Sequence, residues 1–496
     1  MPNEQSNKNL FDPDRWGLPL ERIEALPDQL HQHWERFHDC FKTRTRDTSE
    51  HAYQYLRGQL TMDKDRHYAG IARQTEGNDG QALQHFMSNS PWSGQRVYER
   101  IQEDIGATPQ LAQGGFLILD ESADEKADIH SAGSGRQYNG RMGKVDTCQV
   151  AVVLGYANWK SGPWPTWALI DSELFLSTEW FTPDWAALRR QLGILQERQF
   201  ATKPQLGLRM IQRAKQRGLP FEALSCDDFY GRDGHFRAEL DRQHLMYFAD
   251  FPAHQHVFLE RPQIGVPAKT AITGRPKRKL KILNGVKSQR VDQVAQTTAL
   301  SWQRLFIRHN ERGGVEDEFA ARRVWTWTKG EPDAREEWLI IRIERSGKRK
   351  YTLSNAPLDT PLERLAEGCC SRYFVERVIQ DAKEETGWAE FQAQKYLGWE
   401  HHTALTACAL WFIAQTKLSW AEDVARDPQL AHQLEVEVLP ALSTANVREM
   451  LKAVLPLPQL SPQEARVQVV KHLVNRSRST ASRLRRRHRK NVKVQT

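Results

Sequence analysis

The feature that most constrains the fold is a change of hydrophobic pattern near Gly114, followed by apolar runs that end in aspartate. Upstream, apolar residues between positions 15 and 105 recur at spacings of three and four, which is typical of amphipathic helices. From Gly114 onward the apolar residues form short runs separated by turn residues, as in strands. These runs are residues 115–120, 147–156 and 167–176. They predict a three-stranded meander whose first strand ends at Asp120.

The next stretch alternates between helices and strands. Helical periodicity predicts helices at 184–199 and 204–217, a short strand then ends at Asp227, and another strand is expected at 245–249. A mixed α/β core is therefore expected, in which helices pack against a sheet.

A second group of strands follows and divides this core. Residues 323–328, 337–343 and 350–354 predict a small β-sheet unit inserted in the main domain. A long helix is expected from 361 to 395 and another from 401 to 418. We therefore expect five segments. They are an N-terminal helical DNA-binding domain (1–105), a first core part (106–260), a basic segment with the inserted β subdomain (261–360), a second core part (361–455), and a C-terminal helix with a basic tail (456–496).

Three acidic residues are the candidate catalytic and metal-binding residues: Asp120, Asp227 and Glu376. Two strand-end aspartates and a helix glutamate suit a site for two Mg²⁺ ions, which prefer hard oxygen ligands. Two such ions roughly 3.5–4 Å apart stabilise the attacking and leaving oxygens of a phosphodiester. Asp227 is preferred to its neighbour Asp228 because it directly follows the apolar run. Glu384 and Glu385 lie further along the glutamate helix and rank below Glu376.

The order of the acids is that of an RNase H-like fold: a first Asp on the meander, a second Asp after helices, and a Glu on a later helix. The chain also resembles DDE-superfamily transposases of bacterial insertion sequences, in the group with an inserted β domain. Their YREK signature is matched by Arg372, Glu376 and Lys383, while Cys369 stands where that group has Tyr. Further similar segments are 134–149, 226–231, 353–357 and 398–402.

This resemblance implies a cut-and-paste DNA transposase that acts at the inverted repeats of its own element. It implies two Mg²⁺ ions as cofactor, with Mn²⁺ able to substitute, and a homodimer in the synaptic complex. Arg372 and Lys383 would hold DNA phosphates. In the inserted β unit, Trp325 and Trp327 are candidates for stacking on a flipped base, although packing within a small sheet explains either tryptophan equally well.

Positive charge is concentrated in two stretches, and without the C-terminal stretch the chain is nearly neutral. The net charge is +8, and residues 475–496 alone hold nine Lys or Arg and no acid, as does the stretch Arg261–Arg290. Such local concentration suits a polyanion such as DNA. The candidate DNA-binding residues here are Lys277, Arg278, Lys279, Arg485, Arg486 and Arg487. For the tail, a solvated charge run is the alternative.

The N-terminal helices have two interpretations. Residues 81–101 predict two helices joined at Asn89–Pro91, which would suit a helix-turn-helix DNA reader. The alternative is a helical bundle that packs on the next domain.

Several function classes are not supported. There is no GxxxxGK[ST] phosphate loop and no CxxC pair, and the apolar runs are too short for a membrane span. We expect a reduced, cytoplasmic, nucleoid-associated protein. Two rival functions remain, a metal-dependent nuclease without strand transfer and a domesticated, non-catalytic DNA-binding protein.

Overall fold

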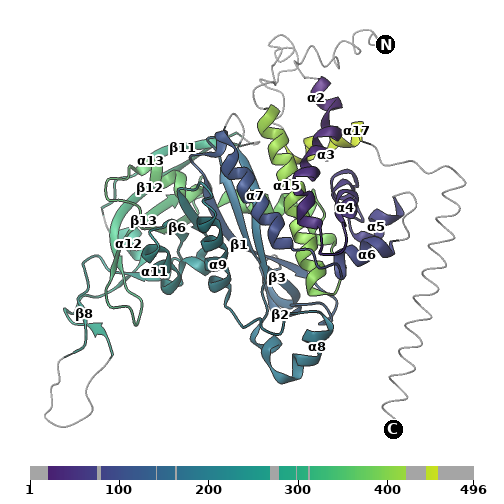
Figure 1. Ribbon diagram of the computed structural model, residues 1–496. Coiled ribbons are helices and arrows are strands. Elements are labelled where there is room, and N and C mark those ends of the chain that lie inside the picture. Colours follow the sequence, from purple (N-terminus) through teal and green to yellow (C-terminus); the bar gives the residue numbers. More distant parts are fainter. Residues whose placement is uncertain are drawn as a thin grey trace, which may run out of the picture.

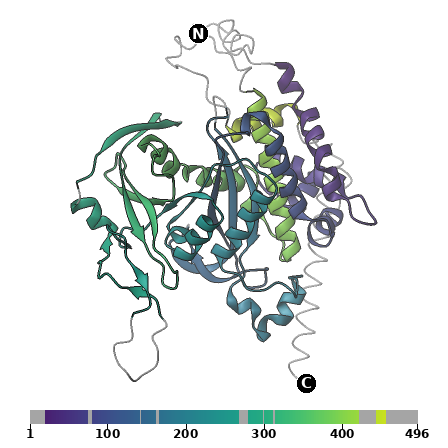
Figure 2. The same ribbon diagram turned by 60° about the vertical axis from the view of Figure 1, so that its left-hand side comes forward.

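The computed structural model describes residues 20–74, 80–140, 142–161, 165–267, 279–297, 299–310, 313–420 and 443–455. A large mixed sheet runs through the molecule, and helices cover both of its faces (Figure 1). Turned by 60°, the N-terminal helices lie on one side of the molecule and the strands of residues 303–354 on the other (Figure 2).

The core of the sheet has the strand order β4-β3-β1-β5-β6. The antiparallel strands are β1 (Phe116–Glu125), β3 (Lys144–Asn158) and β4 (Thr166–Leu174). The strands β5 (Ala223–Cys226) and β6 (Met246–Asp250) run parallel to β1. A meander followed by two parallel strands on its far side is the RNase H-like arrangement, so the predicted fold class is confirmed. A further hairpin strand, β2 (Gly135–Asn139), pairs with the start of β3 and was not anticipated.

Burial explains why the first half of β1 consists of consecutive apolar residues. Phe116 to Leu119 are fully buried, because β1 has strands on both sides and helices on both faces. On one face lies α9 (Lys203–Gln216), which starts with a capping box between Thr202 and Gln205. Gly207 lets this helix approach β1, since a Cβ there would stand 2.7 Å from a methyl group of Leu119. The backbone just before Asp120 is therefore held from both sides.

The inserted strands extend this sheet instead of forming a separate small one. They are β11 (Gln303–Asn310), β12 (Gly313–Thr326), β13 (Arg335–Ile343) and β14 (Arg349–Ser354), all antiparallel. β14 pairs with β6, which gives one sheet of ten strands. The physical reason is that β6 would otherwise be an open edge with unpaired backbone groups.

The remaining short elements lie in the connections. The strands are β7 (His256–Val257), β8 (Ile264–Gly265), β9 (Lys281–Ile282) and β10 (Gln289–Arg290). The helices are α8 (Ala186–Gln191), α10 (Asp228–Gly231), α11 (Gly234–Arg242) and α12 (Val291–Thr297). The 3₁₀ turns are η2 (His38–Phe41), η3 (Pro109–Leu111), η4 (Thr178–Phe181), η5 (Pro183–Trp185) and η6 (Trp388–Glu390). Only a short helix thus forms within the predicted helix 184–199, because Pro183 and Gly193 bound it.

A helical layer covers the meander side of the sheet and is built around one buried helix, α15 (Tyr396–Trp420). The N-terminal helices of this layer are α2 (Leu20–Glu24), α3 (Leu26–Phe37), α4 (Ser49–Thr61), α5 (Tyr68–Arg73), α6 (Gln81–Ser88) and α7 (Gly94–Ala107). Of these, α5 packs on α4 and α6. From the C-terminal side α17 (Thr444–Val454) joins them. α15 is buried nearly all round, as expected of a helix without a polar face.

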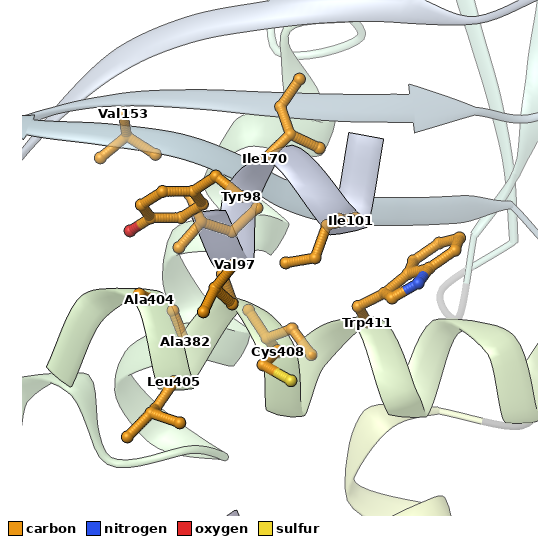
Figure 3. Close-up of a cluster of buried hydrophobic side chains, with 14 of the residues drawn as sticks. Val97, Tyr98, Ile101, Val153, Ile170, Ala382, Ala404, Leu405, Cys408 and Trp411 are labelled. Atoms are coloured by element: carbon orange, nitrogen blue, oxygen red, sulfur yellow. The ribbon is translucent and has the colours of Figure 1, made fainter. Parts of the chain in front are cut away.

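The N-terminal helices share their hydrophobic core with this buried helix and with the sheet. Figure 3 shows Val97 and Ile101 of α7 beside Leu405 of α15 and Ile170 of β4. The hydroxyl groups of Tyr98 and Ser172 lie 2.7 Å apart in the same region. The two predicted helices of the 81–101 segment are present as α6 and α7, and α7 uses its apolar face for packing. DNA contact by this segment stays a prediction.

The predicted single helix from 361 to 395 is wrong, because it is broken at Ser371–Arg372. Its parts are α13 (Leu362–Cys370) and α14 (Tyr373–Glu384). The buried Ser371 hydroxyl donates to the carbonyl of Gly368 at 2.7 Å, which competes with the helical backbone bonds. The break places Arg372 at the start of the helix that carries Glu376.

Candidate active site

Strand register brings the two predicted aspartates side by side. Leu119 of β1 is the parallel partner of Cys226 of β5, so the next residues, Asp120 and Asp227, lie side by side. The prediction that the first strand ends at Asp120 is wrong, because β1 continues to Glu125 through its pairing with β3, whereas β5 does end just before Asp227. Asp227 then caps α10, where its Oδ1 accepts from the backbone N–H groups of Phe229 and Tyr230 at 3.1 and 3.3 Å. The following residue, Asp228, is exposed on the first turn of that helix.

Each of the two aspartates uses one oxygen to fix its orientation. Asp120 Oδ1 accepts from the N–H of Glu121 at 2.7 Å, and Asp227 Oδ1 accepts the capping bonds. Within the described part of the chain, the hydrogen bonds to these carboxylates engage Oδ1 alone. Both Oδ2 atoms are therefore the natural donors for a cation.

The proximity of two carboxylates has an electrostatic cost. Burial, together with the charge of Asp227, raises the pKa of Asp120 to about 7, and the guanidinium of Arg372 opposes this rise. Burial also raises the pKa of Asp227, against the capping N–H groups and Arg372. A site that disfavours its own negative charge gains free energy when a cation binds.

Glu376 faces the same pocket from the opposite wall. It lies in the first turn of α14, with 61% of its side chain exposed, and its Oε1 is 3.1 Å from Nη1 of Arg372. The pocket has a volume of about 1090 Å³. It is lined by Asp120, Glu121, Ser122, Ala123, Tyr138, Gly140, Lys203, Asp227, Asp228, Phe229, Arg232, Arg372, Glu376, Ile379, Gln380, Lys383, Glu384 and Ala389. The three predicted acids thus line one pocket, with Arg372 among them.

Arg372 is the central cation of this cluster. Burial alone would lower the pKa of its guanidinium, but the carboxylates of Asp120, Asp250 and Glu376 outweigh burial and raise the pKa. Arg372 lies between Glu376 and Asp250, whose Oδ2 is 3.5 Å from Nε.

Lys383 has a different environment from the one expected of a phosphate ligand. Its ammonium group lies 2.8 Å from Oδ1 of Asp124 and donates to the carbonyl of Ala123 at 2.8 Å. Both partners belong to β1, so Lys383 fastens α14 to the strand that carries Asp120. Its role in holding DNA stays a prediction.

Cys369, at the position where the YREK group has Tyr, is buried at the end of α13. Its thiol donates to the carbonyl of Ala366 at 3.3 Å, and 7% of the residue is exposed. Tyr373 lies nearby and is covered by the guanidinium of Arg308 at 4.1 Å from the ring centre. Burial of Cys369 excludes direct contact of this side chain with DNA in this conformation.

The carboxylates of Asp120, Asp227 and Glu376 are suitable ligands for a hard divalent cation, although the three are not close enough together to coordinate one ion in this conformation. Among the described residues, no group of three His, Cys, Asp or Glu side chains has metal-binding geometry as it stands. The reason is that Glu376 turns toward Arg372. Carboxylate oxygens are nonetheless the ligands that Mg²⁺ prefers, and the free Oδ2 atoms of Asp120 and Asp227 fit that chemistry.

The other predicted residues lie away from this pocket or outside the described residues. Lys277, Arg278, Arg485, Arg486 and Arg487 lie outside the described residues, whereas Lys279 is described and exposed. Trp325 is half-buried under the guanidinium of Arg261, and the indole N–H of Trp327 donates to the carbonyl of Glu331 at 3.0 Å. Base stacking by these tryptophans stays a prediction.

Four pocket or rim residues were missed by the sequence reasoning. They are Glu121, Tyr138, Lys203 and Asp250. Glu121 and Lys203 form an ion pair in the pocket wall, and Tyr138 projects from the unanticipated strand β2 with 61% exposure. For Asp250 a signal existed, since it follows the apolar run 245–249 just as Asp227 follows its own run.

One further feature concerns membranes. In the part of the chain that the structure describes, no helix is both long and apolar enough to span a bilayer.

Comparisons with known proteins identify the family of this chain. Residues 36–314 match the model of the DDE superfamily endonuclease family, a range that includes Asp120 and Asp227 and ends before Glu376. The chain is 26% identical over 351 residues to the "Probable transposase for insertion sequence element IS701" of Microchaete diplosiphon, covering 70% of this chain and 77% of that protein.

Among solved structures, the piggyBac transposase synaptic complex with hairpin DNA aligns with a TM-score of 0.33 and 9% identity, over 90% of this chain and 84% of that chain. A TM-score of this size supports no transfer of properties to this chain. The family match, in contrast, covers more than half of the chain. This protein therefore belongs to the DDE superfamily endonuclease family, and the resemblance of its motifs to DDE-type insertion-sequence transposases is confirmed.

Proposed function

We propose that this protein is a cut-and-paste DNA transposase that cleaves and joins DNA at the inverted repeats of its own insertion sequence. The observation that carries the proposal is that Asp120 and Asp227 lie side by side on neighbouring parallel strands, with Glu376 lining the same pocket. Membership of the DDE superfamily and similarity to an insertion-sequence transposase support it.

Asp120, Asp227 and Glu376 would hold two Mg²⁺ ions, with Mn²⁺ able to substitute. When bound, such ions lower the pKa of a water nucleophile and stabilise the charge on the leaving 3′-oxygen. The two aspartates are fixed by backbone N–H groups, so they can hold a cation with little rearrangement. Glu376 must first exchange its contact with Arg372, which its exposed side chain permits.

The pocket walls supply positive charge for the DNA backbone. Arg372 and Arg232 line it beside the carboxylates, and Lys203 is paired with Glu121 at its edge. Guanidinium groups bind phosphate oxygens through two parallel N–H donors. We infer that Arg372 contacts the phosphate next to the cleaved bond, and that the basic stretches bind DNA further away. A homodimer would align the two element ends.

The same carboxylates serve hydrolysis and strand transfer, so joining is what separates a transposase from a nuclease. The 3′-hydroxyl released by the first cut would attack the opposite strand and later the target DNA. Excision together with reinsertion therefore tests the proposal more sharply than nicking alone.

The experiment uses a plasmid that carries the gene between its native flanking sequences. Excision and reinsertion are scored for the wild type, for Glu376→Gln and for the matched control Glu384→Gln, which changes another pocket glutamate further along α14. We expect excision and target joining in the wild type and the Glu384→Gln variant, and none in Glu376→Gln. Nicked DNA without joined products would favour a nuclease, and flank binding without any cleavage would favour a domesticated DNA-binding protein.

A further inference from the structure

A third aspartate stands in the same row as Asp120 and Asp227. β6 pairs with β5 in parallel register, with Ala249 opposite Cys226. Asp250 is therefore next to Asp227, just as Asp227 is next to Asp120. Three aspartates thus occupy one level across three adjacent parallel strands, within β1, just after β5 and at the end of β6, and the proposed metal site uses two of them.

Asp250 is held firmly and points toward Arg372. Its Oδ1 accepts from the hydroxyl of Thr352 on β14 at 2.9 Å, which orients the carboxylate from the neighbouring strand. Its Oδ2 lies 3.5 Å from Nε of Arg372, and the two side chains are only 22% and 24% exposed. Water screens this pair less than it screens an exposed ion pair. The attraction is one of charge without a hydrogen bond, because the buried Nε of Arg372 has no hydrogen-bond partner among the described residues.

Arg372 therefore touches two carboxylates through different parts of its guanidinium. Nε faces Asp250, while Nη1 lies 3.1 Å from Oε1 of Glu376. In the absence of other cations, Arg372 neutralises part of the negative charge of the whole cluster. Divalent cations at the catalytic carboxylates would compete with it for Glu376 and would also repel the guanidinium.

We propose that Asp250 is a positioning residue for Arg372, an inference that rests on the proposed metal-dependent function. Asp250 retains Arg372 at the rim of the pocket when Glu376 turns to a metal ion, so the arginine stays in place for a DNA phosphate. Without the charge of Asp250, Arg372 would pair with Glu376 alone and would compete with the metal. Asp250 itself does not touch the metal or the DNA.

The test is a double-mutant cycle in the full-length chain, with Asp250→Asn, Arg372→Ala and the combined variant. The first readout is the rise of the melting temperature on titration with MgCl₂ or MnCl₂ without DNA, since ligand binding to the folded state stabilises it by mass action. The second readout is the Mg²⁺ concentration at half-maximal nicking of an element end. Asp317→Asn is the matched control, because Asp317 is a buried aspartate that pairs with Arg342 at 2.7 Å on the inserted strands.

We expect Asp250→Asn to raise the metal concentration at half-maximal effect roughly 5- to 10-fold, because Arg372 then competes for Glu376. In the Arg372→Ala background the same substitution should change this concentration less than about twofold. Asp317→Asn should lower the melting temperature and leave the metal midpoint at the wild-type value.

Three results would overturn the inference. An equal rise in both backgrounds would make Asp250 a direct metal ligand. An unchanged metal midpoint in Asp250→Asn, with only a lower melting temperature as in Asp317→Asn, would make the residue structural. If neither Mg²⁺ nor Mn²⁺ stabilised the wild-type chain, no metal ion would compete with Arg372 for Glu376, and the proposed role of Asp250 would fail. In contrast, a chain that binds metal but nicks no DNA would contradict the proposed function and leave the Asp250 result standing.

Discussion

At the scale of single residues, the two aspartates were predictable and the surroundings of the glutamate were not. An aspartate that directly follows an apolar run is visible in sequence. The choice of Asp227 over Asp228 stays a prediction, since both residues line the pocket. The contact of Arg372 with Glu376 spans only four positions, whereas its contact with Asp250 joins residues more than a hundred positions apart. No local pattern encodes such a contact.

Cys369 provides the first prediction, at this same scale. Cys369→Tyr would restore the residue of the YREK group but would force a large side chain into the core beside Phe248. Overpacking of this kind costs about 1–3 kcal/mol. We expect a lower melting temperature and no gain in nicking rate. An increase in nicking with unchanged stability would contradict this, and would mean that the pocket opens to admit a DNA-contacting tyrosine.

At the scale of elements, strand periodicity was more informative than helix length. The meander, β5 and β6 follow directly from apolar runs bounded by turn residues. The break between α13 and α14 was missed because Ser371 disturbs the helix through its own side-chain hydrogen bond. The joining of β14 to β6 was missed because strand pairing across an insertion is a non-local choice.

Lys383 offers a prediction about how α14 is attached to the sheet. Its ammonium and Asp124 have only 14% and 15% of their side chains exposed, so Lys383→Met would leave a largely buried carboxylate unpaired. We expect a loss of about 1–3 kcal/mol in stability, measured by denaturant unfolding, with DNA affinity nearly unchanged. The double variant Lys383→Met with Asp124→Asn should recover part of the stability. A large loss of DNA affinity at wild-type stability would instead identify Lys383 as a phosphate ligand.

His402 makes the stability of α15 dependent on pH. Its Nε2 lies 3.1 Å from the carbonyl of Trp388, and its Nδ1 lies 2.8 Å from the hydroxyl of Tyr55. Burial lowers the pKa of His402 from 6.5 to about 4, although the carbonyls of Trp388 and Gly387 and the charge of Asp124 act to raise it. The neutral imidazole is therefore the form that the folded state accepts.

The sign of the effect follows from linkage. The unfolded chain binds a proton at His402 below about pH 6.5 while the folded chain does not, so stability falls as the pH drops from 6.5 toward 4. The slope is at most about 1.4 kcal/mol per pH unit for this group. We expect the difference in melting temperature between the wild type and His402→Gln to shrink over this range. A constant difference would contradict the assignment of a neutral His402.

At the scale of the whole molecule, the strongest concentration of positive charge lies far along the sequence from the candidate catalytic residues Asp120 and Asp227. The described residues form the candidate catalytic pocket, while residues 475–496 hold nine cations and no acid. If this tail binds phosphates, the logarithm of DNA affinity should fall steeply with the logarithm of salt concentration. Deleting 475–496 should flatten that slope by about 0.9 for each phosphate that the tail neutralises. An unchanged slope, measured by fluorescence anisotropy with flank DNA, would identify the tail as a solvated charge run.

The central claim is that the adjacent aspartates hold the metal, and a change of metal preference tests it most directly. In Asp227→Cys a soft thiolate replaces a hard carboxylate, which disfavours Mg²⁺ and is better tolerated by Mn²⁺. The matched control is Asp228→Cys, one residue along and exposed. Nicking of an element end is measured with each metal. The account predicts that Asp227→Cys loses nicking in Mg²⁺ and regains part of it in Mn²⁺, while Asp228→Cys works in both. Mg²⁺-supported nicking by Asp227→Cys at the wild-type rate would contradict it.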